Sequence, residues 1–283
     1  MSHALFVSKN LIGDALNISP AWRAWWALHQ GPEQHVDLLT NPDQIAALYS
    51  AMGVPANIIT TMSQEEALKS NRYDLVFNFD VARAFHLGIR NKMHITQAYA
   101  KMLGVTIDSV KPVCLLDDER YLRQEIEKGC ILVSPFSESC SSRKGLHPNK
   151  MLPVAKWIPV IEYLKTLGRA MYVLGSVKDK WIAEFSLPEK CYLLGTYSLL
   201  EVARIMRDRA SMIVTVDNGM SHLAASQDLP TFLFYPACLP MEWILPRGNP
   251  HCSPMQLDPP SCEPDQILQV AQDVVPRLLR IKI

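Results

Sequence analysis

Residues 212–226, MIVTVDNGMSHLAAS, join a short apolar run to a turn and then to a second apolar stretch. The run Met212–Val216 is rich in branched aliphatic residues, which favours a buried strand. The turn Asp217-Asn218-Gly219 leads into a short helix that we expect over Ser221–Ser226. A strand that runs directly into a helix is the repeating unit of a parallel α/β sheet. The stretch therefore predicts a doubly wound fold around it.

The same alternation extends in both directions along the chain. We expect further strands at Ala4–Ser8, His35–Thr40, Asn57–Thr61, Tyr73–Phe79, Ile131–Phe136, Ala170–Gly175, Cys191–Leu194 and Thr231–Tyr235. We expect helices at Ala15–Leu28, Asp43–Met52, His94–Leu103, Val154–Thr166, Ser198–Arg207 (opened by a capping box) and Asp265–Leu279, with an irregular, proline-rich stretch from Pro236 to Pro264.

A polar stretch from Lys111 to Gly129 interrupts the alternation, and its DDERYLRQEIEK part (117–128) is expected to form a surface helix. We interpret this stretch as the connection between two domains. The prediction is an α/β protein with an N-terminal Rossmann-like domain (1–115), a linker (116–130) and a C-terminal Rossmann-like domain (131–283) facing each other across a cleft. The last helix is free to pack back on the N-terminal domain.

Composition excludes several classes of protein. The chain has 283 residues with 28 Lys+Arg and 28 Asp+Glu, so no net charge draws it to nucleic acid in general. Its apolar runs are far shorter than the roughly 18 residues of a membrane span, which leaves only peripheral membrane contact open. The start MSHALFVSKN does not resemble a secretory signal, and seven cysteines without a CxxC pair fit a reducing compartment. We expect a cytoplasmic protein.

Ligands of open α/β sheets bind outside the carboxyl ends of the strands, which directs attention to four loops. In the first loop Gly13 allows close backbone approach, and Asp14 is either a helix N-cap or a catalytic carboxylate. No GxGxxG or P-loop pattern accompanies it. The second loop interleaves hydroxyls with cations at Ser141, Arg143 and Lys144, which suits phosphate oxygens as well as a plain solvated loop.

The third loop is the Asp217–His222 turn. We expect bare backbone N–H groups at a helix N-terminus there, which is an anion site, with His222 on the first turn as donor or as a buried structural residue. The fourth loop pairs the strand ends at Gly175-Ser176 and Gly195-Thr196-Tyr197, which we expect to bracket a base or ribose. Metal-ligand motifs are absent from the sequence, so no metal cofactor is expected.

A basic stretch lies in the N-terminal half. It suits an anionic acceptor and equally a solvated basic face; its members are Arg83, His86, Arg90, Lys92, His94 and Lys101.

These loops carry motifs that resemble glycosyltransferase family 9, of the ADP-heptose:lipopolysaccharide heptosyltransferase type, over nearly the whole chain. The resemblance rests on Ile12-Gly13-Asp14-Ala15-Leu16 with Pro20-Ala21-Trp22-Arg23, on Tyr73-Asp74-Leu75-Val76, on His94-Ile95-Thr96 with Leu103-Gly104, on Lys150-Met151-Leu152-Pro153 with Trp157, on Gly195-Thr196 before the helix that Ser198 opens, and on Asp217-Asn218-Gly219-Met220-Ser221-His222-Leu223-Ala224-Ala225.

The resemblance implies a GT-B fold and an inverting, metal-independent transfer from a nucleotide-diphospho sugar, ADP-heptose-like by analogy, to a glycan or other hydroxyl acceptor. In it Asp14 is the general base. The residues implied to hold the diphosphate are Lys150, Asp217, Asn218, Gly219 and His222, with Ser141, Arg143 and Lys144 as additional contacts.

Two positions depart from the family pattern, since Leu152 replaces a Trp and Asn218 replaces Ser or Thr. The N-terminal half, where the acceptor binds, is also short for the family. Two alternatives therefore stay open: an inactive nucleotide-binding module, and a glycosyltransferase whose acceptor is a protein or a nucleic-acid base.

Overall fold

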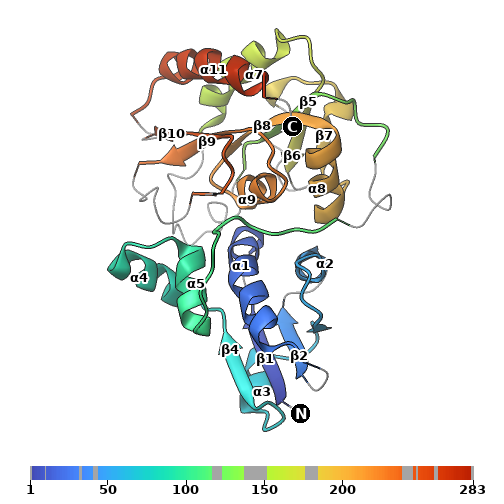
Figure 1. The fold of residues 1–283 in the computed structure, drawn as a ribbon. Coiled ribbons are helices and arrows are strands. Elements are labelled where there is room, and N and C mark those ends of the chain that lie inside the picture. The colour runs from blue at the N-terminus through green and yellow to red at the C-terminus, as the bar shows by residue number, and fades with distance from the viewer. Residues whose placement is uncertain are drawn as a thin grey trace. The chain divides into compact units, whose positions relative to one another are not determined.

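The computed structural model divides the chain into two compact units, which Figure 1 draws as ribbons. Unit 1 comprises residues 1–116 and 242–248, and unit 2 comprises residues 117–241 and 249–283. The structure describes residues 2–9, 11–31, 34–40, 44–116, 123–136, 152–175, 184–237, 245–246, 248–257 and 261–281.

Unit 1 is built on a four-stranded sheet in the order β3-β2-β1-β4, with every neighbouring pair parallel. Its strands are β1 (Ser2–Ser8), β2 (Gln34–Thr40), β3 (Asn57–Ile59) and β4 (Leu75–Asn78). Its helices are α1 (Ile12–His29), α2 (Gln44–Ser50), α3 (Gln64–Lys69), α4 (Val81–Asn91) and α5 (Ile95–Leu103). The sequence analysis did not predict α3 and α4; the other elements lie within a few residues of their expected positions.

Alternation along β1 fills both faces of this sheet. Phe6 contacts Trp25 on α1, with ring centroids 4.8 Å apart. On the opposite face Leu5 and Val7 pack with Ala67 of α3. A strand whose residues are apolar on both sides belongs between two layers of helices, as in other parallel sheets.

Helix α1 contains a proline in its interior. Pro20 has no N–H, so it cannot donate to the carbonyl of Leu16. The Ser19 hydroxyl donates to that carbonyl at 2.7 Å and accepts from Val113 N at 2.8 Å. Ser19 therefore compensates the proline and attaches the middle of α1 to the end of unit 1.

Unit 2 is built on a six-stranded parallel sheet in the order β10-β9-β8-β5-β6-β7. Its strands are β5 (Cys130–Ser134), β6 (Met171–Gly175), β7 (Tyr192–Leu194), β8 (Ala210–Val216), β9 (Thr231–Pro236) and β10 (Cys252–Leu257). Its helices are α7 (Val154–Lys165), the short 3₁₀ helix η4 (Glu189–Cys191), α8 (Leu199–Asp208), α9 (Gly219–Ser226) and α11 (Pro264–Leu278). Read from the opposite edge, this is the 3-2-1-4-5-6 order of a Rossmann sheet.

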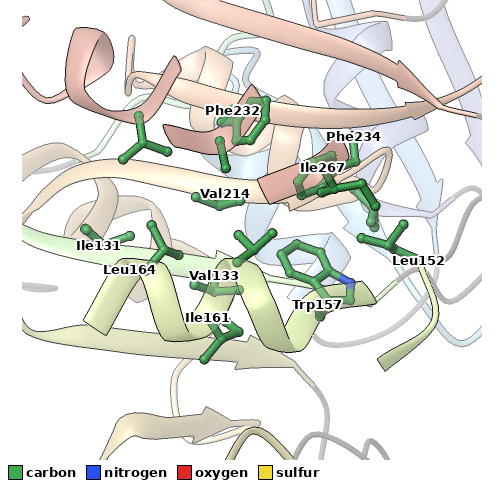
Figure 2. Packing of buried hydrophobic residues seen from close by; sticks show 14 of the residues in the cluster. Ile131, Val133, Leu152, Trp157, Ile161, Leu164, Val214, Phe232, Phe234 and Ile267 are labelled. Atoms are coloured by element: carbon green, nitrogen blue, oxygen red, sulfur yellow. The ribbon is translucent and has the colours of Figure 1, made fainter. Parts of the chain in front are cut away.

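Helices cover both faces of the unit 2 sheet, with α7 and α11 on one side and α8 and α9 on the other (Figure 1). Figure 2 shows the first of these layers, in which Trp157 and Ile161 of α7 pack on strand residues such as Val133 and Val214. Ile267 of α11 belongs to the same core. The last helix is thus part of the core of unit 2, where the sequence analysis left it free to pack on the other domain.

Two local expectations for unit 2 were wrong. The stretch expected to be irregular contains β10, an edge strand with Pro254 in its middle. Residues 123–128, expected to end a surface helix, form turns. The capping box at Ser198 is confirmed, since Ser198 Oγ accepts from Glu201 N and Glu201 accepts from Ser198 N.

Candidate functional site

Each sheet has one point where the strand order reverses. In unit 1 this point lies between β1 and β4, and in unit 2 it lies between β5 and β8. Open α/β sheets bind ligands outside the carboxyl ends of the strands at such points. The loops that begin at Ser8, Asn78, Ser134 and Val216 are therefore the first candidates, and each unit is described separately below.

In unit 2, strand β8 ends in a buried carboxylate. Asp217 is 3% exposed, and its backbone N–H donates to the carbonyl of Phe234 at 3.1 Å. Helix α9 starts two residues later, at Gly219.

Asn218 is the N-cap of α9. Its Oδ1 accepts from Met220 N at 2.9 Å and from Ser221 N at 3.2 Å. Its Nδ2 donates to the hydroxyl of Ser134 at 3.0 Å and to the carbonyl of Phe136 at 2.5 Å. The amide thus joins the ends of β5 and β8 across the point where the strand order reverses.

This geometry corrects two parts of the sequence-based argument. The N–H groups of Met220 and Ser221, expected to be bare, are occupied by Asn218. The Asn218 amide, expected to donate to a phosphate, donates to unit 2 itself. Thr215 reinforces the arrangement, because its hydroxyl lies 3.0 Å from Ser134 O and 3.2 Å from Asn218 Oδ1. Ser134 and Thr215 are not among the predicted site residues, although both are hydroxyl residues near the ends of buried strands.

The turn offers a ligand fewer hydrogen-bonding groups than expected. Gly219 is the first residue of α9, and His222, which is 5% exposed, lies on its first turn. A helix N-terminus with an imidazole beside it favours an anion, while the Asp217 carboxylate can only accept hydrogen bonds, as from hydroxyls.

The cationic loop after β5 falls outside the described residues, and with it Ser141, Arg143, Lys144 and Lys150. The motif that follows that loop is described and is structural. Leu152 is 2% exposed and Trp157 is fully buried, and both belong to the core layer of Figure 2. Leu at position 152 in place of Trp therefore supplies apolar core volume.

The ends of β6 and β7 meet as the fourth loop pair requires, since Gly195 N donates to Gly175 O at 3.0 Å. Gly195 has a φ of 65°, a conformation that glycine adopts without strain. Thr196 follows and is exposed. Ser176 lies outside the described residues. The backbone hydrogen bonding between β6 and β7 thus continues to the ends of both strands.

Two residues from the expected linker, Arg123 and Glu125, lie next to Tyr197, which follows these strand ends. Neither residue was predicted as part of the site. The Arg123 guanidinium pairs with Glu201 and lies 5.5 Å from the ring centre of Tyr197. The Tyr197 hydroxyl donates to Glu125 at 3.0 Å. A backbone hydrogen bond is the main cause that lowers the pKa of Glu125, and Tyr197 adds to it.

In unit 1, Asp14 is the third residue of α1 and is half-buried. The N-cap position belongs to Leu11, which makes no side-chain capping bond, and Gly13 is the second residue of the helix. The interpretation of Asp14 as an N-cap is therefore wrong. A carboxylate in the first turn interacts favourably with the helix dipole without having to cap it.

Two buried tyrosines lie within electrostatic range of Asp14. Tyr49 Oη and Ser8 Oγ share a hydrogen bond at the end of β1. Burial raises the pKa of Tyr49 and of Tyr99 well above the usual value, and the charge of Asp14 adds to both shifts. Both phenols therefore stay protonated at neutral pH.

The basic stretch of unit 1 divides into exposed and buried members. Arg83, His86, Arg90 and Lys92 are exposed on α4 and at its end. Lys101 is also exposed, and its ammonium group lies 3.3 Å from Asn91 Oδ1. A solvated basic face therefore exists on α4.

His94 does not belong to that face. It is 3% exposed, its Nδ1 accepts from Thr96 N at 3.2 Å, and its Nε2 lies 2.8 Å from Leu245 O. It caps α5, and through Leu245 it contacts a residue of unit 1 that lies far along the chain. The prediction that His94 contacts the acceptor is wrong, because both ring nitrogens are engaged inside the unit.

Within the described residues, no group of three or more His, Cys, Asp or Glu side chains is arranged to hold a metal ion. In the same part of the chain, no helix is long and apolar enough to cross a membrane.

The chain matches the model of glycosyltransferase family 9 (heptosyltransferase) over residues 39–247. Among solved structures it is similar to the E. coli ADP-heptose lipopolysaccharide heptosyltransferase II, with a TM-score of 0.71 and 16% identity over 99% of this chain and 98% of that one. A family 9 glycosyltransferase from Veillonella parvula gives a TM-score of 0.71 and 13% identity over 98% and 97% of the two chains. No curated protein sequence matches the chain.

A third similar structure is described as an iron-containing, dodecameric glycosyltransferase, TibC from enterotoxigenic E. coli. Its TM-score is 0.67, with 15% identity over 99% of this chain and 79% of that one. These likenesses confirm the α/β architecture of GT-B type with its two parallel sheets.

Proposed function

The chain belongs to glycosyltransferase family 9, and from that membership we propose an inverting, metal-independent transfer of a heptose-like sugar from an ADP-sugar to a hydroxyl acceptor. Membership makes the chain a glycosyltransferase that uses a nucleotide sugar. The stereochemistry, the independence from metal, the acceptor and the roles of single residues are the proposal.

The position of Asp14 carries the proposal. A half-buried carboxylate follows the strand at which the order of the unit 1 sheet reverses, and capping of α1 does not explain it. In the proposed step Asp14 takes the proton of the acceptor hydroxyl while that oxygen attacks the anomeric carbon. The bond from this carbon to the diphosphate breaks, and its electron pair leaves with the diphosphate. A single displacement inverts the anomeric centre.

The donor is proposed to bind at the carboxyl end of the unit 2 sheet. The N-terminus of α9 at Gly219 and the imidazole of His222 face negative charge favourably, and Lys150, Ser141, Arg143 and Lys144 supply cations and hydroxyls. Such donors stabilise the charge that develops on a diphosphate leaving group without a metal ion. Asp217 accepts from donor hydroxyls, Asn218 holds the turn, and Gly175 and Thr196 line the side of the nucleoside.

The acceptor is proposed to be anionic. Arg83, Arg90 and Lys92 present exposed positive charge on and after α4, which follows the second strand at the same reversal point. We further propose that the reaction takes place in the cytoplasm as part of lipopolysaccharide assembly. The described cysteines are free thiols, and burial raises the pKa of Cys130 to about 12, so it stays unreactive there.

The decisive experiment measures thermal unfolding of the full chain with a panel of ADP-, UDP- and GDP-sugars. A ligand that binds the native state raises its melting temperature by mass action, and an ADP-sugar is expected to give the largest shift. Turnover is then followed by NMR, which reports the anomeric configuration of the product, with and without EDTA. A chain stabilised by none of these donors contradicts the donor proposal; loss of activity with EDTA contradicts independence from metal.

A further inference from the structure

Helix α1 begins with a residue that is unusual at its position. Leu11 is the N-cap of α1, with extended backbone angles of −80° and 175° and no side-chain capping bond. The first N–H groups of a helix have no partner within the helix, and Ser, Thr, Asp or Asn at the N-cap usually accepts from one of them. A leucine side chain cannot accept, so Leu11 leaves α1 less stable than a capping residue would.

Other helices of the chain have the usual caps. Ser63 at the start of α3, Ser198 at the start of α8 and Asn218 at the start of α9 each accept from a backbone N–H in the first turn. Helices α1 and α9 both follow strands that flank a reversal point, yet α1 carries leucine where α9 carries asparagine. The departure from usual capping therefore lies at the helix that enters the candidate site of unit 1.

Burial does not compensate for the missing cap, since Leu11 is 45% exposed. Among the exposed large apolar side chains of the described residues, Leu11 is the one that lies in the loop between β1 and α1, at the carboxyl end of the unit 1 sheet. Residues that lower stability without a structural gain are most often found at functional sites. A functional role therefore accounts for leucine at this position.

Leu11 is a neighbour of the proposed base. Leu11 is the N-cap of α1, and Asp14 is the third residue of that helix. In α3 the residues at these two positions contact each other: Ser63 Oγ accepts from Glu66 N at 3.1 Å, and the Glu66 carboxylate accepts from Ser63 N at 2.8 Å. The first turn of α8 has the same pair of bonds. The same spacing brings Leu11 beside Asp14 at the start of α1.

We propose that Leu11 is a specificity-determining residue, which makes the site prefer an acceptor with an apolar C–H surface beside its hydroxyl over water. The inference rests on the proposed function, in which Asp14 is the general base. A sugar-like acceptor presents C–H groups next to each hydroxyl, and contact between these groups and Leu11 removes apolar surface from water. A water molecule has no such surface, so it gains nothing from the contact.

The reaction that this preference suppresses is hydrolysis of the donor. In that reaction Asp14 takes a proton from a water molecule while the water oxygen forms a bond to the anomeric carbon. The bond from this carbon to the diphosphate breaks, and its electron pair leaves with the diphosphate, so the products are the free sugar and the nucleoside diphosphate. A leucine side chain offers this water no hydrogen bond beside Asp14, whereas a hydroxyl group does.

Donor hydrolysis without an acceptor tests the proposal. The full chain is incubated with ADP-heptose as the probe, and the release of ADP is measured. Leu11→Ser is expected to raise the rate of hydrolysis by about tenfold, because the serine hydroxyl holds a water beside Asp14 and the apolar contact is lost. Leu11→Met keeps an apolar side chain of similar volume and is expected to hydrolyse the donor as slowly as the unmodified chain.

Thermal unfolding separates this role from a structural one. Leu11→Ser supplies a capping oxygen, so the melting temperature is expected to rise by about 2–4 °C. A variant that is more stable and less selective than the unmodified chain identifies a residue kept for function. The matched control is Leu28→Ser in the last turn of the same helix, at a side chain that is 70% exposed, which is expected to leave donor hydrolysis unchanged.

Three results overturn the proposal: donor hydrolysis that Leu11→Ser does not raise, hydrolysis by Leu11→Met as fast as by Leu11→Ser, or a Leu11→Ser variant that is less stable than the unmodified chain. Failure of the proposed function gives a different result, because ADP-heptose then neither raises the melting temperature of the unmodified chain nor is turned over by it.

Discussion

The two sheets have the same arrangement of parallel strands around a reversal point but differ in their number of strands. Unit 2 has the complete six-strand Rossmann order, whereas unit 1 ends one strand beyond its reversal point. Both keep the two central strands that flank the reversal, β5 and β8 or β1 and β4, at whose carboxyl ends the proposed donor and acceptor sites lie. The comparison teaches that the reversal point is present in the four-stranded sheet as well as in the six-stranded one, although the described part of unit 1 has no strand beyond β4.

The helix starts at the two sites also differ. Helix α9 is capped by Asn218, whose amide is anchored on the end of β5. Helix α1 has Leu11 at its N-cap without a side-chain capping bond, and Asp14 stands in its first turn. Under the proposed function, the α9 arrangement would bind the diphosphate, and Asp14 on α1 would be the base.

The largest expected effect breaks the unit 1 side of this comparison. Asp14→Asn removes the proposed base and keeps the shape of the side chain, so kcat should fall by on the order of 10²-fold or more. Donor affinity should be unchanged, and stability should change by no more than the roughly 0.3–1 kcal/mol of a helix-dipole interaction. Steady-state kinetics, donor titration and thermal unfolding measure the three quantities.

The control for this variant is Asp80→Asn, at the other strand end of unit 1. Asp80 Oδ1 caps α4 by accepting from Ala82 N and Arg83 N, and Asn caps equally well. Its kcat should stay near that of the unmodified chain. An Asp14→Asn variant that retains most of its activity would remove Asp14 from the reaction.

The next effect tests the unit 2 side. Lys150→Ala should weaken the binding of nucleoside diphosphate by about 1.5–3 kcal/mol, the usual range for a hydrogen bond to a charged group. Calorimetric titration with ADP measures it, with kcat at saturating donor as a companion. Unchanged affinity would transfer the role to Arg143 or Lys144, whose alanine variants are the natural next pair.

A smaller effect concerns the anchor of the α9 turn. Asn218→Ala removes the cap and should lower the free energy of unfolding by about 1–2 kcal/mol. Asn218→Ser restores a capping oxygen and should recover most of this loss. Chemical denaturation of the two variants side by side provides the measurement. Equal loss in both would mean that the bonds from Nδ2 to Ser134 and Phe136 matter more than the cap.

The smallest expected effect sharpens the acceptor side. Charge reversal at Arg90 and Lys92, both exposed, should raise the acceptor KM several-fold and leave donor affinity unchanged, because exposed charges contribute about 1 kcal/mol or less each. Lys69→Glu on α3, also exposed, serves as the control. The effect should shrink as salt is added. Acceptor kinetics that do not respond would exclude this face from acceptor binding.

Much of the fold could be predicted from the sequence because strands that run directly into helices are a local pattern. The missed elements lack that pattern. Pro254 disguises β10, since proline is tolerated only at a sheet edge and the edge itself is a long-range property. Helix α3 has six residues, too few for a clear period.

The site was predicted less completely, and for a definite reason. For Asp14 the residue type left two roles open, N-cap and catalytic carboxylate, and for Asn218 the resemblance implied a contact with the diphosphate. In the structure Leu11 occupies the N-cap position of α1, and Asn218 caps α9. Asn directly before an apolar helix is a strong capping signal, so the N-cap role of Asn218 could have been predicted from the sequence. His94 was grouped with neighbouring cations because of its charge. In the structure its Nε2 contacts the backbone carbonyl of Leu245, which lies 151 residues away in sequence.

That distance has a consequence for how the chain folds as it is made. Unit 1 is almost complete when residue 116 is synthesised, but its segment 242–248 follows only after most of unit 2. Until then the nascent unit holds His94 without the Leu245 carbonyl, and a buried ring nitrogen must find water instead. Unit 1 can therefore condense early on the ribosome, but it closes late, as the last part of unit 2 emerges.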